Sequence, residues 1–128
     1  MTSPWTGDEL ARIGDVEEFE ISVRRRDGGL RDPVTVWVVR AGDDLYVRSA
    51  VKGRDAAWYR AVSETREGRI SGGRVERDVR FEDADPALND EVDAAYRTKY
   101  RRYAGRILNS CLTPSARSTT LRIAPNPN

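Results

Sequence analysis

The sequence contains no histidine and a single cysteine, Cys111. The absence of imidazole excludes Ser-His-Asp and Cys-His catalytic sites and the usual histidine-containing zinc and iron centres, because all of them depend on that ring. One cysteine cannot form an internal disulfide bond. Any proton transfer would fall to tyrosine, carboxylates or Cys111, which suits either a pure binding role or a cofactor that supplies the difficult chemistry.

The chain also lacks an excess of charge of one sign and a long apolar run. Its 22 basic residues are balanced by 21 acidic ones, and a net charge of +1 provides no long-range field that would attract nucleic acid or an anionic membrane. The first residues do not have the charged and apolar segments of a signal peptide, and no stretch is apolar enough to span a bilayer. We therefore expect a cytoplasmic protein without nucleic-acid or membrane partners. The acidic residues show no calcium-loop spacing, so we expect no metal site.

Alternation of apolar and polar residues predicts strands through most of the chain. The expected strands cover residues 16–26, 33–40, 45–48, 75–82 and 118–123, and a further short piece begins near Ile70. The expected helices are an N-terminal one at 1–14 with Thr6 and Glu9 at capping-box spacing, one from its cap Asp55 to about Gly68, and a long amphipathic one at 85–105 with Asp85 as cap. Turns are expected at 41–44, at Gly72 and Gly73 and at 113–115, and residues 124–128 are expected to fray. About six strands joined mostly by hairpins predict a single α+β domain, mainly β, over residues 1–128: an antiparallel barrel or strongly curled sheet with flanking helices.

A cationic loop follows the third expected strand. It brings together Arg48, Ser49, Lys52, Gly53 and Arg54 just before a helix start. Guanidinium, ammonium, hydroxyl and free backbone N–H donors in one place suit an anion such as a phosphate. Arg48 and Arg54 also have a structural interpretation, as solvated ends of surface elements paired with nearby aspartates. Both interpretations stay open from the sequence.

The aromatic residues near this loop have two interpretations as well. Trp37 and Trp58 are more typical of core residues than of ligand contacts. Tyr96 and Tyr100 begin as core residues on one face of the long helix, but a buried hydroxyl needs a partner, and one of them could serve as a proton donor to a ligand. They are the weak candidates for a catalytic role.

Motifs throughout the chain resemble an uncharacterised family that is known only as a domain of unknown function. These motifs are Arg31-x-Pro33-Val34, Trp37, Gly42-Asp43-x-Leu45-Tyr46-Val47-Arg48-Ser49, Gly53, Trp58-Tyr59-Arg60, Gly68-x-Ile70, Gly73, Asp78-Val79-x-Phe81-Glu82, Ala95-Tyr96-x-x-Lys99-Tyr100 and Thr119-Thr120-Leu121. The strand, the glycine loop and the Trp-Tyr helix also resemble, more distantly, the split β-barrel flavin- and deazaflavin-dependent nitroreductases.

The more distant resemblance implies a fold, a cofactor and a site. It implies a split antiparallel β-barrel, usually a homodimer, with flavin mononucleotide (FMN) or a deazaflavin coenzyme in a groove near the subunit interface. Carried over to this sequence, the cofactor phosphate would contact Arg48, Ser49, Lys52, Gly53 and Arg54, and Trp58 would pack beside the loop. Where the deazaflavin enzymes often have an Arg-Ser-Gly turn, this chain has Asp27, which would repel an anion.

Two classes of function are consistent with these observations, and a third stays open. The first is a flavin- or deazaflavin-dependent oxidoreductase that passes hydride to a small organic substrate. The alternative is a non-redox split barrel that holds no cofactor and binds a small anionic ligand or a protein partner, which Asp27 and the lack of histidine both permit. The third is a catalyst without a cofactor that uses tyrosine and carboxylates.

Overall fold

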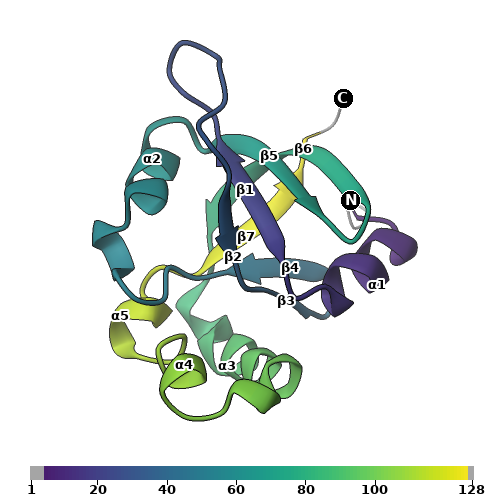
Figure 1. Ribbon diagram of the computed structural model, residues 1–128, viewed down its shortest axis with the longest axis vertical. Coiled ribbons are helices and arrows are strands. Elements are labelled where there is room, and N and C mark those ends of the chain that lie inside the picture. The colour runs from purple at the N-terminus through teal and green to yellow at the C-terminus, as the bar shows by residue number, and fades with distance from the viewer. Residues whose placement is uncertain (1–4, 127–128) are drawn as a thin grey trace.

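A computed structural model describes residues 5–126, and its centre is one seven-stranded antiparallel sheet. The strands are β1 (Phe19–Val23), β2 (Val34–Val36), β3 (Val38–Ala41), β4 (Asp44–Val47), β5 (Glu67–Gly72), β6 (Val75–Asp83) and β7 (Leu121–Pro125). They pair in the order β2-β1-β5-β6-β7-β4-β3, and the sheet curls until it is nearly closed (Figure 1). The predicted α+β, mainly β barrel is confirmed, with seven strands in place of about six.

The barrel is split where the chain passes from β2 to β3. The sequence predicted one continuous strand at 33–40, but β2 pairs with β1 and β3 pairs with β4, on opposite edges of the sheet. Trp37 is the residue between them, and its carbonyl accepts a hydrogen bond from the Tyr96 hydroxyl at 2.8 Å instead of a strand partner. One bent segment therefore forms both edges of the split.

The strand β5 and the helix before it differ from the prediction. Helix α2 (Ala57–Thr65) ends at Arg66 in the left-handed conformation, and Gly68 lies inside β5. A side chain at Gly68 would meet the Ser22 carbonyl at 2.5 Å, so close strand packing, and not a helix end, explains this glycine. Asp55 is not the helix cap, because it lies in the short 3₁₀ helix η1 (Gly53–Asp55) and Ala56 caps α2 without a side-chain bond.

The long helix predicted at 85–105 is broken into several pieces. They are η2 (Pro86–Leu88), α3 (Asn89–Lys99), η3 (Arg101–Tyr103) and α4 (Arg106–Asn109). The Asp85 cap is confirmed by its bond from the Ala87 amide at 2.9 Å. The helix stops at Tyr100, which leaves helical geometry, buries its ring fully and donates its hydroxyl to the Val38 carbonyl at 2.9 Å. Tertiary packing therefore overrides the helical pattern here.

The two ends of the chain also differ in extent from the expectation. Helix α1 (Gly7–Asp15) has the capping box predicted from Thr6 and Glu9, while residues 1–4 of the expected 1–14 helix lie outside the described residues. At the other end, Ala124 and Pro125 are buried in β7 and so do not fray, and residues 127–128 lie outside the described part. Short helix α5 (Pro114–Arg117) replaces an expected turn, with Thr113 as its cap.

Two apolar clusters lie on the two sides of the sheet. The larger fills the inside of the curled sheet and extends under α1 and α2. The smaller lies between β3–β4 and α3–α4 and contains the buried rings of Tyr46, Tyr96 and Tyr100. Among the described residues, no helix is long and apolar enough to cross a membrane.

Candidate functional site

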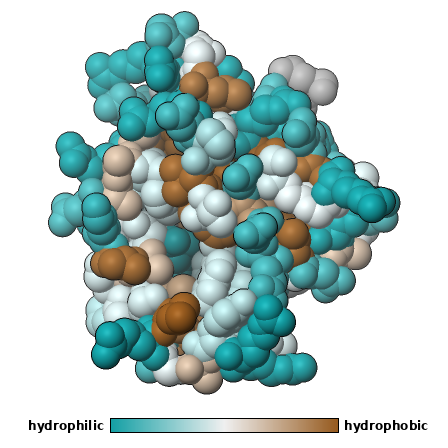
Figure 2. Space-filling view, viewed as in Figure 1, coloured by the Kyte–Doolittle hydropathy of each residue, from teal (hydrophilic) through white to brown (hydrophobic). Residues whose placement is uncertain are grey.

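A groove opens at the split of the barrel and contains most of the predicted site. It has a volume of about 450 Å³. We call it the split groove, and its lining consists of Thr35–Trp37, Arg48–Lys52, Ala56, Trp58, Tyr96, Ile107, Ser110 and Cys111. At its rim, Val51 is 87% exposed and Ile107 is 57% exposed. Figure 2 shows isolated apolar surfaces over the β4–η1 segment and over α4, the parts of the chain to which these two residues belong.

Trp37 lines the split groove, and its ring packs against two other aromatic rings. Its ring stacks on the ring of Tyr100 with centroids 4.0 Å apart and planes 3° from parallel. The Tyr103 ring packs against it at 5.1 Å with a 41° tilt. Because Tyr100 is itself fully buried, the indole is held in place from behind. The sequence did not identify this role, since a tryptophan inside an apolar strand segment is indistinguishable from a core residue.

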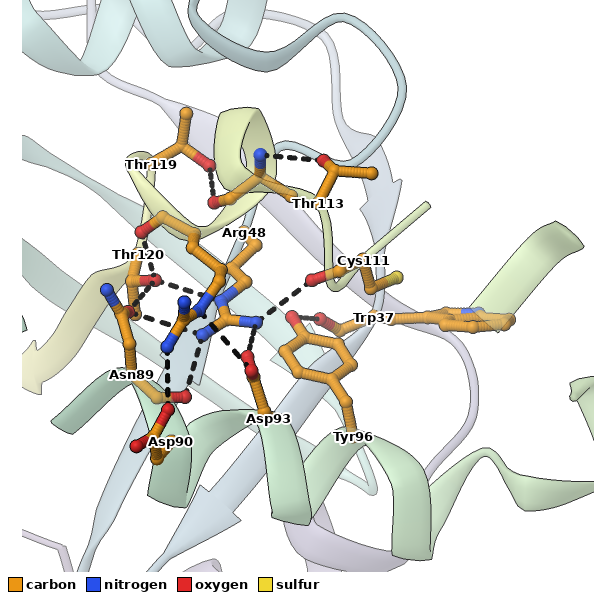
Figure 3. Close-up of polar contacts among 12 residues, drawn as sticks. Trp37, Arg48, Asn89, Asp90, Asp93, Tyr96, Cys111, Thr113, Thr119 and Thr120 are labelled. Atoms are coloured by element: carbon orange, nitrogen blue, oxygen red, sulfur yellow. Dashed lines mark hydrogen bonds and ion pairs between the residues drawn. The ribbon is translucent and has the colours of Figure 1, made fainter. Parts of the chain in front are cut away.

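The guanidinium of Arg48 lies beneath the split groove and is fully bonded to the protein. Its Nε donates to Thr120 Oγ1 at 2.9 Å, and Nη1 donates to Asp93 Oδ1 and to the Cys111 carbonyl (Figure 3). Its Nη2 donates to the carbonyl and the side chain of Asn89, both at 3.2 Å. Arginine has five N–H donors, so every donor has an acceptor within the protein. In this structure Arg48, which directly follows β4, binds Thr120 just before β7, two residues of α3 and Cys111 after α4, and it does not offer a free donor to a ligand.

Ser49 and Lys52 line the groove with side-chain donors that no residue from 5 to 126 uses, and Ser49 is only 2% exposed. The Ser49 amide is taken by Thr119 Oγ1 at 2.9 Å, but its hydroxyl makes no hydrogen bond within residues 5–126. Lys52 is exposed and has no ion pair or hydrogen-bond partner among those residues. An unpaired ammonium in the lining of the groove is a suitable contact for a phosphate or a carboxylate.

Gly53 and Arg54 lie away from the split groove. Gly53 has a φ of +54° and packs against α5, where an added Cβ would lie 2.2 Å from Ser115 Oγ. Arg54 donates to the Ser118 carbonyl at 3.3 Å and lines a different hollow between α2 and α5. The structure therefore brings Arg48, Ser49, Lys52 and Trp58 to the groove and turns these two residues elsewhere.

Trp58 lies in the first turn of α2 at the opposite side of the groove from α3. It is partly buried against the main core, and its ring meets Tyr59 edge-on at 6.0 Å. The N-terminus of α2 has no side-chain cap, which leaves first-turn amides without an intrahelical partner near the groove. Both the aromatic ring and the amide dipoles suit an aromatic anion.

The hydroxyls and the thiol near the groove are all in their neutral forms at neutral pH. Burial raises the pKa of Tyr96 well above its ordinary value and also raises the pKa of Tyr100 and Cys111. The Tyr96 and Tyr100 hydroxyls donate to the carbonyls of Trp37 and Val38. Tyr100 does not line the groove. Tyr96 does, but its hydroxyl already donates its hydrogen bond to the Trp37 carbonyl. Within the described residues, no group of histidine, cysteine and carboxylate side chains could hold a metal ion.

The curled sheet with a groove at its split defines a split-barrel domain, and comparison with known proteins agrees with this class. Residues 9–123 match the model of the family described as "Uncharacterized protein conserved in bacteria (DUF2255)", so the chain belongs to that family. A search of curated protein sequences gave no match.

Two solved structures share the fold at low sequence identity. A structure titled "F420 Reductase" superposes with a TM-score of 0.55 at 17% identity, covering 91% of this chain and 92% of that one. The FAD and heme binding protein from Mycobacterium smegmatis superposes with a TM-score of 0.51 at 18% identity, covering 91% of this chain and 62% of that one. At these identities the likeness establishes the split-barrel fold alone.

Proposed function

We propose that the split groove binds a flavin-type redox cofactor, FMN or a deazaflavin, and that the protein is an oxidoreductase acting on a small organic substrate. The observation that carries this proposal is that one groove is lined both by Trp37, which is stacked on Tyr100, and by Lys52, whose ammonium has no partner among residues 5–126. Two structures with the same fold carry the names of an F420 reductase and of an FAD and heme binding protein, which supports the same class of cofactor.

The residues that line the groove fit such a cofactor in size and chemistry. A volume of about 450 Å³ lies within the range of about 300–1,000 Å³ that is usual for small-molecule sites. Trp37 and Trp58 would contact the flat ring system, and Lys52 and Ser49 would bind its phosphate. The bound cofactor would supply hydride transfer. The protein's part is to orient the ring and to keep water away from it.

The apolar rim supports a further part of this proposal, that the protein is a homodimer. Val51 and Ile107 are exposed at the open side of the groove, where a second subunit would cover them. A cytoplasmic location also stays a prediction from the sequence.

The alternative is a binding module without redox chemistry, and one observation favours it. All five donors of Arg48 and both tyrosine hydroxyls are bonded within the protein, so the groove offers few groups for proton transfer. Such a groove would still bind an aromatic anion through Trp37 and Lys52. Binding of FMN or F420 together with reduction of a bound substrate would decide for the oxidoreductase.

The test is a titration of the purified protein with FMN and with coenzyme F420, monitored through tryptophan and cofactor fluorescence. We expect Lys52→Ala to weaken binding by about 1.5–3 kcal/mol, or about 10- to 150-fold, because a charge-assisted hydrogen bond to the phosphate is lost. Arg54→Ala is the matched control, since it removes a cation two residues away that faces another hollow. We expect it to leave the affinity unchanged within about twofold. Equal effects of the two substitutions, or no binding of either cofactor, would contradict the proposed site.

A further inference from the structure

A second hollow shares the lining residue Trp58 with the split groove. It is lined by Val23, Arg25, Arg31, Asp32, Pro33, Val34, Ala57 and Trp58 and has a volume of about 360 Å³. We call it the arginine hollow. Trp58 lines both spaces, and the strand β2 contributes Val34 to one and Thr35 and Val36 to the other. The two hollows are therefore neighbours along the same strand and the same helix start.

The arginine hollow carries two exposed arginines that the surrounding protein leaves unpaired. Neither Arg25 nor Arg31 has a side-chain ion pair or hydrogen bond with any residue from 5 to 126. Other arginines of this region are paired: Arg24 contacts Asp78 at 3.6 Å and Arg26 contacts Glu64 at 3.4 Å. Asp32 is the one carboxylate in the lining, which therefore contains two guanidinium groups and one carboxylate, all of them exposed.

The backbone at the two arginines is hydrogen-bonded within the hairpin. The Arg25 amide donates to the Gly29 carbonyl at 2.7 Å, and the Arg31 amide donates to the Val23 carbonyl at 2.9 Å. These bonds close the β1–β2 hairpin loop, the long loop at the top of Figure 1. Ala57, at the uncapped start of α2, lines the same space and adds a favourable dipole for an anion.

From this juxtaposition we infer that the arginine hollow is a second anion subsite of the same ligand, which receives a negatively charged group beyond the first phosphate. The inference rests on the proposed function, since the ring and first phosphate occupy the split groove. The ligand is then elongated: its flat ring lies against Trp37, its chain passes Trp58, and its distal anion contacts Arg25 and Arg31. The planar guanidinium can form two parallel hydrogen bonds with either a phosphate or a carboxylate. The shared requirement is therefore a second anionic group, as a phosphate or as a carboxylate.

The experiment compares three probes with the same type of ring: FMN, which ends at its first phosphate, FAD, which has a second phosphate, and coenzyme F420, which carries glutamate carboxylates beyond its phosphate. We expect FAD or F420 to bind more tightly than FMN. We expect Arg25→Ala/Arg31→Ala to lower the affinity for that elongated probe by about tenfold or more and to leave FMN within about twofold. Added salt should reduce the difference between wild type and double variant.

The control is Arg26→Ala, which removes a cation from the same loop that is paired with Glu64 and does not line the hollow. It should change none of the three affinities by more than about twofold. If the double substitution Arg25→Ala/Arg31→Ala weakens the binding of FAD alone, the subsite binds phosphate. If it weakens the binding of F420 alone, the subsite binds carboxylate. If FMN binds and responds to Lys52→Ala while neither elongated probe responds to the double variant, the second subsite is overturned and the proposed function stands. If no probe binds, both are overturned.

Discussion

Replacing Arg48 by methionine should destabilise the fold by about 3–5 kcal/mol. The substitution keeps much of the side-chain volume but removes five hydrogen bonds and the ion pair with Asp93. The carboxylate of Asp93 is only 10% exposed and would keep a single contact, to Arg117 Nε at 3.3 Å. A buried charge that loses its main partner has this large cost, and domains of this kind have a total stability of about 5–15 kcal/mol.

Urea denaturation at pH 7, followed by tryptophan fluorescence and far-UV circular dichroism, measures the loss. Arg54→Met is the control, because that exposed side chain makes one bond, to the Ser118 carbonyl, and its loss should change the free energy of unfolding by less than about 0.5 kcal/mol. In the double variant Arg48→Met/Asp93→Leu both charges are absent, so it should be more stable than Arg48→Met alone. A loss below about 1 kcal/mol in Arg48→Met, with no recovery in the double variant, would refute the structural role assigned to Arg48.

Two further substitutions test the loop and a buried amine. Gly53→Ala should cost about 1–3 kcal/mol because of its positive φ and the contact with Ser115, whereas Gly7→Ala, with open space around it, should be neutral within about 0.5 kcal/mol in the same denaturation assay. Burial lowers the pKa of Lys99 to about 8 from 10.5, so between these pH values the unfolded chain binds more protons and the folded protein gains stability as pH rises. Relative to Lys99→Met, the wild type should gain about 1–2 kcal/mol from pH 8 to 10.5 in thermal or urea unfolding, and a flat difference would contradict the lowered pKa.

The sequence predicted the architecture well where patterns are local. Alternation located β1 and β6, the glycines at 42 and 73 marked turns that have positive φ, and the capping box located α1. It failed where distant residues decide the geometry. The break at Trp37 depends on a hydroxyl 59 residues away, and the early end of α3 depends on the bond of Tyr100 to Val38, 62 residues away.

The candidate site shows the same limit. Local donors predicted an anion site, and Ser49 and Lys52 do line the groove with donors that no described residue uses. Arg48 looked equivalent to Lys52 in the sequence, yet its acceptors lie between 41 and 72 positions away and no local pattern reveals them. Trp37 was indistinguishable from a core residue for the same reason. Its significance depends on which ring stacks behind it.

The position of β7 affects how this protein can fold during its synthesis. β7 pairs with β6 on one side and with β4 on the other, so it alone joins the β2-β1-β5-β6 group to the β3–β4 hairpin. A ribosome releases residues 121–125 after all the other strands, and until then the hairpin has no neighbour in the sheet. Two partly folded halves with open edges should therefore persist on the nascent chain, and this is a stage at which a chaperone would have most to protect.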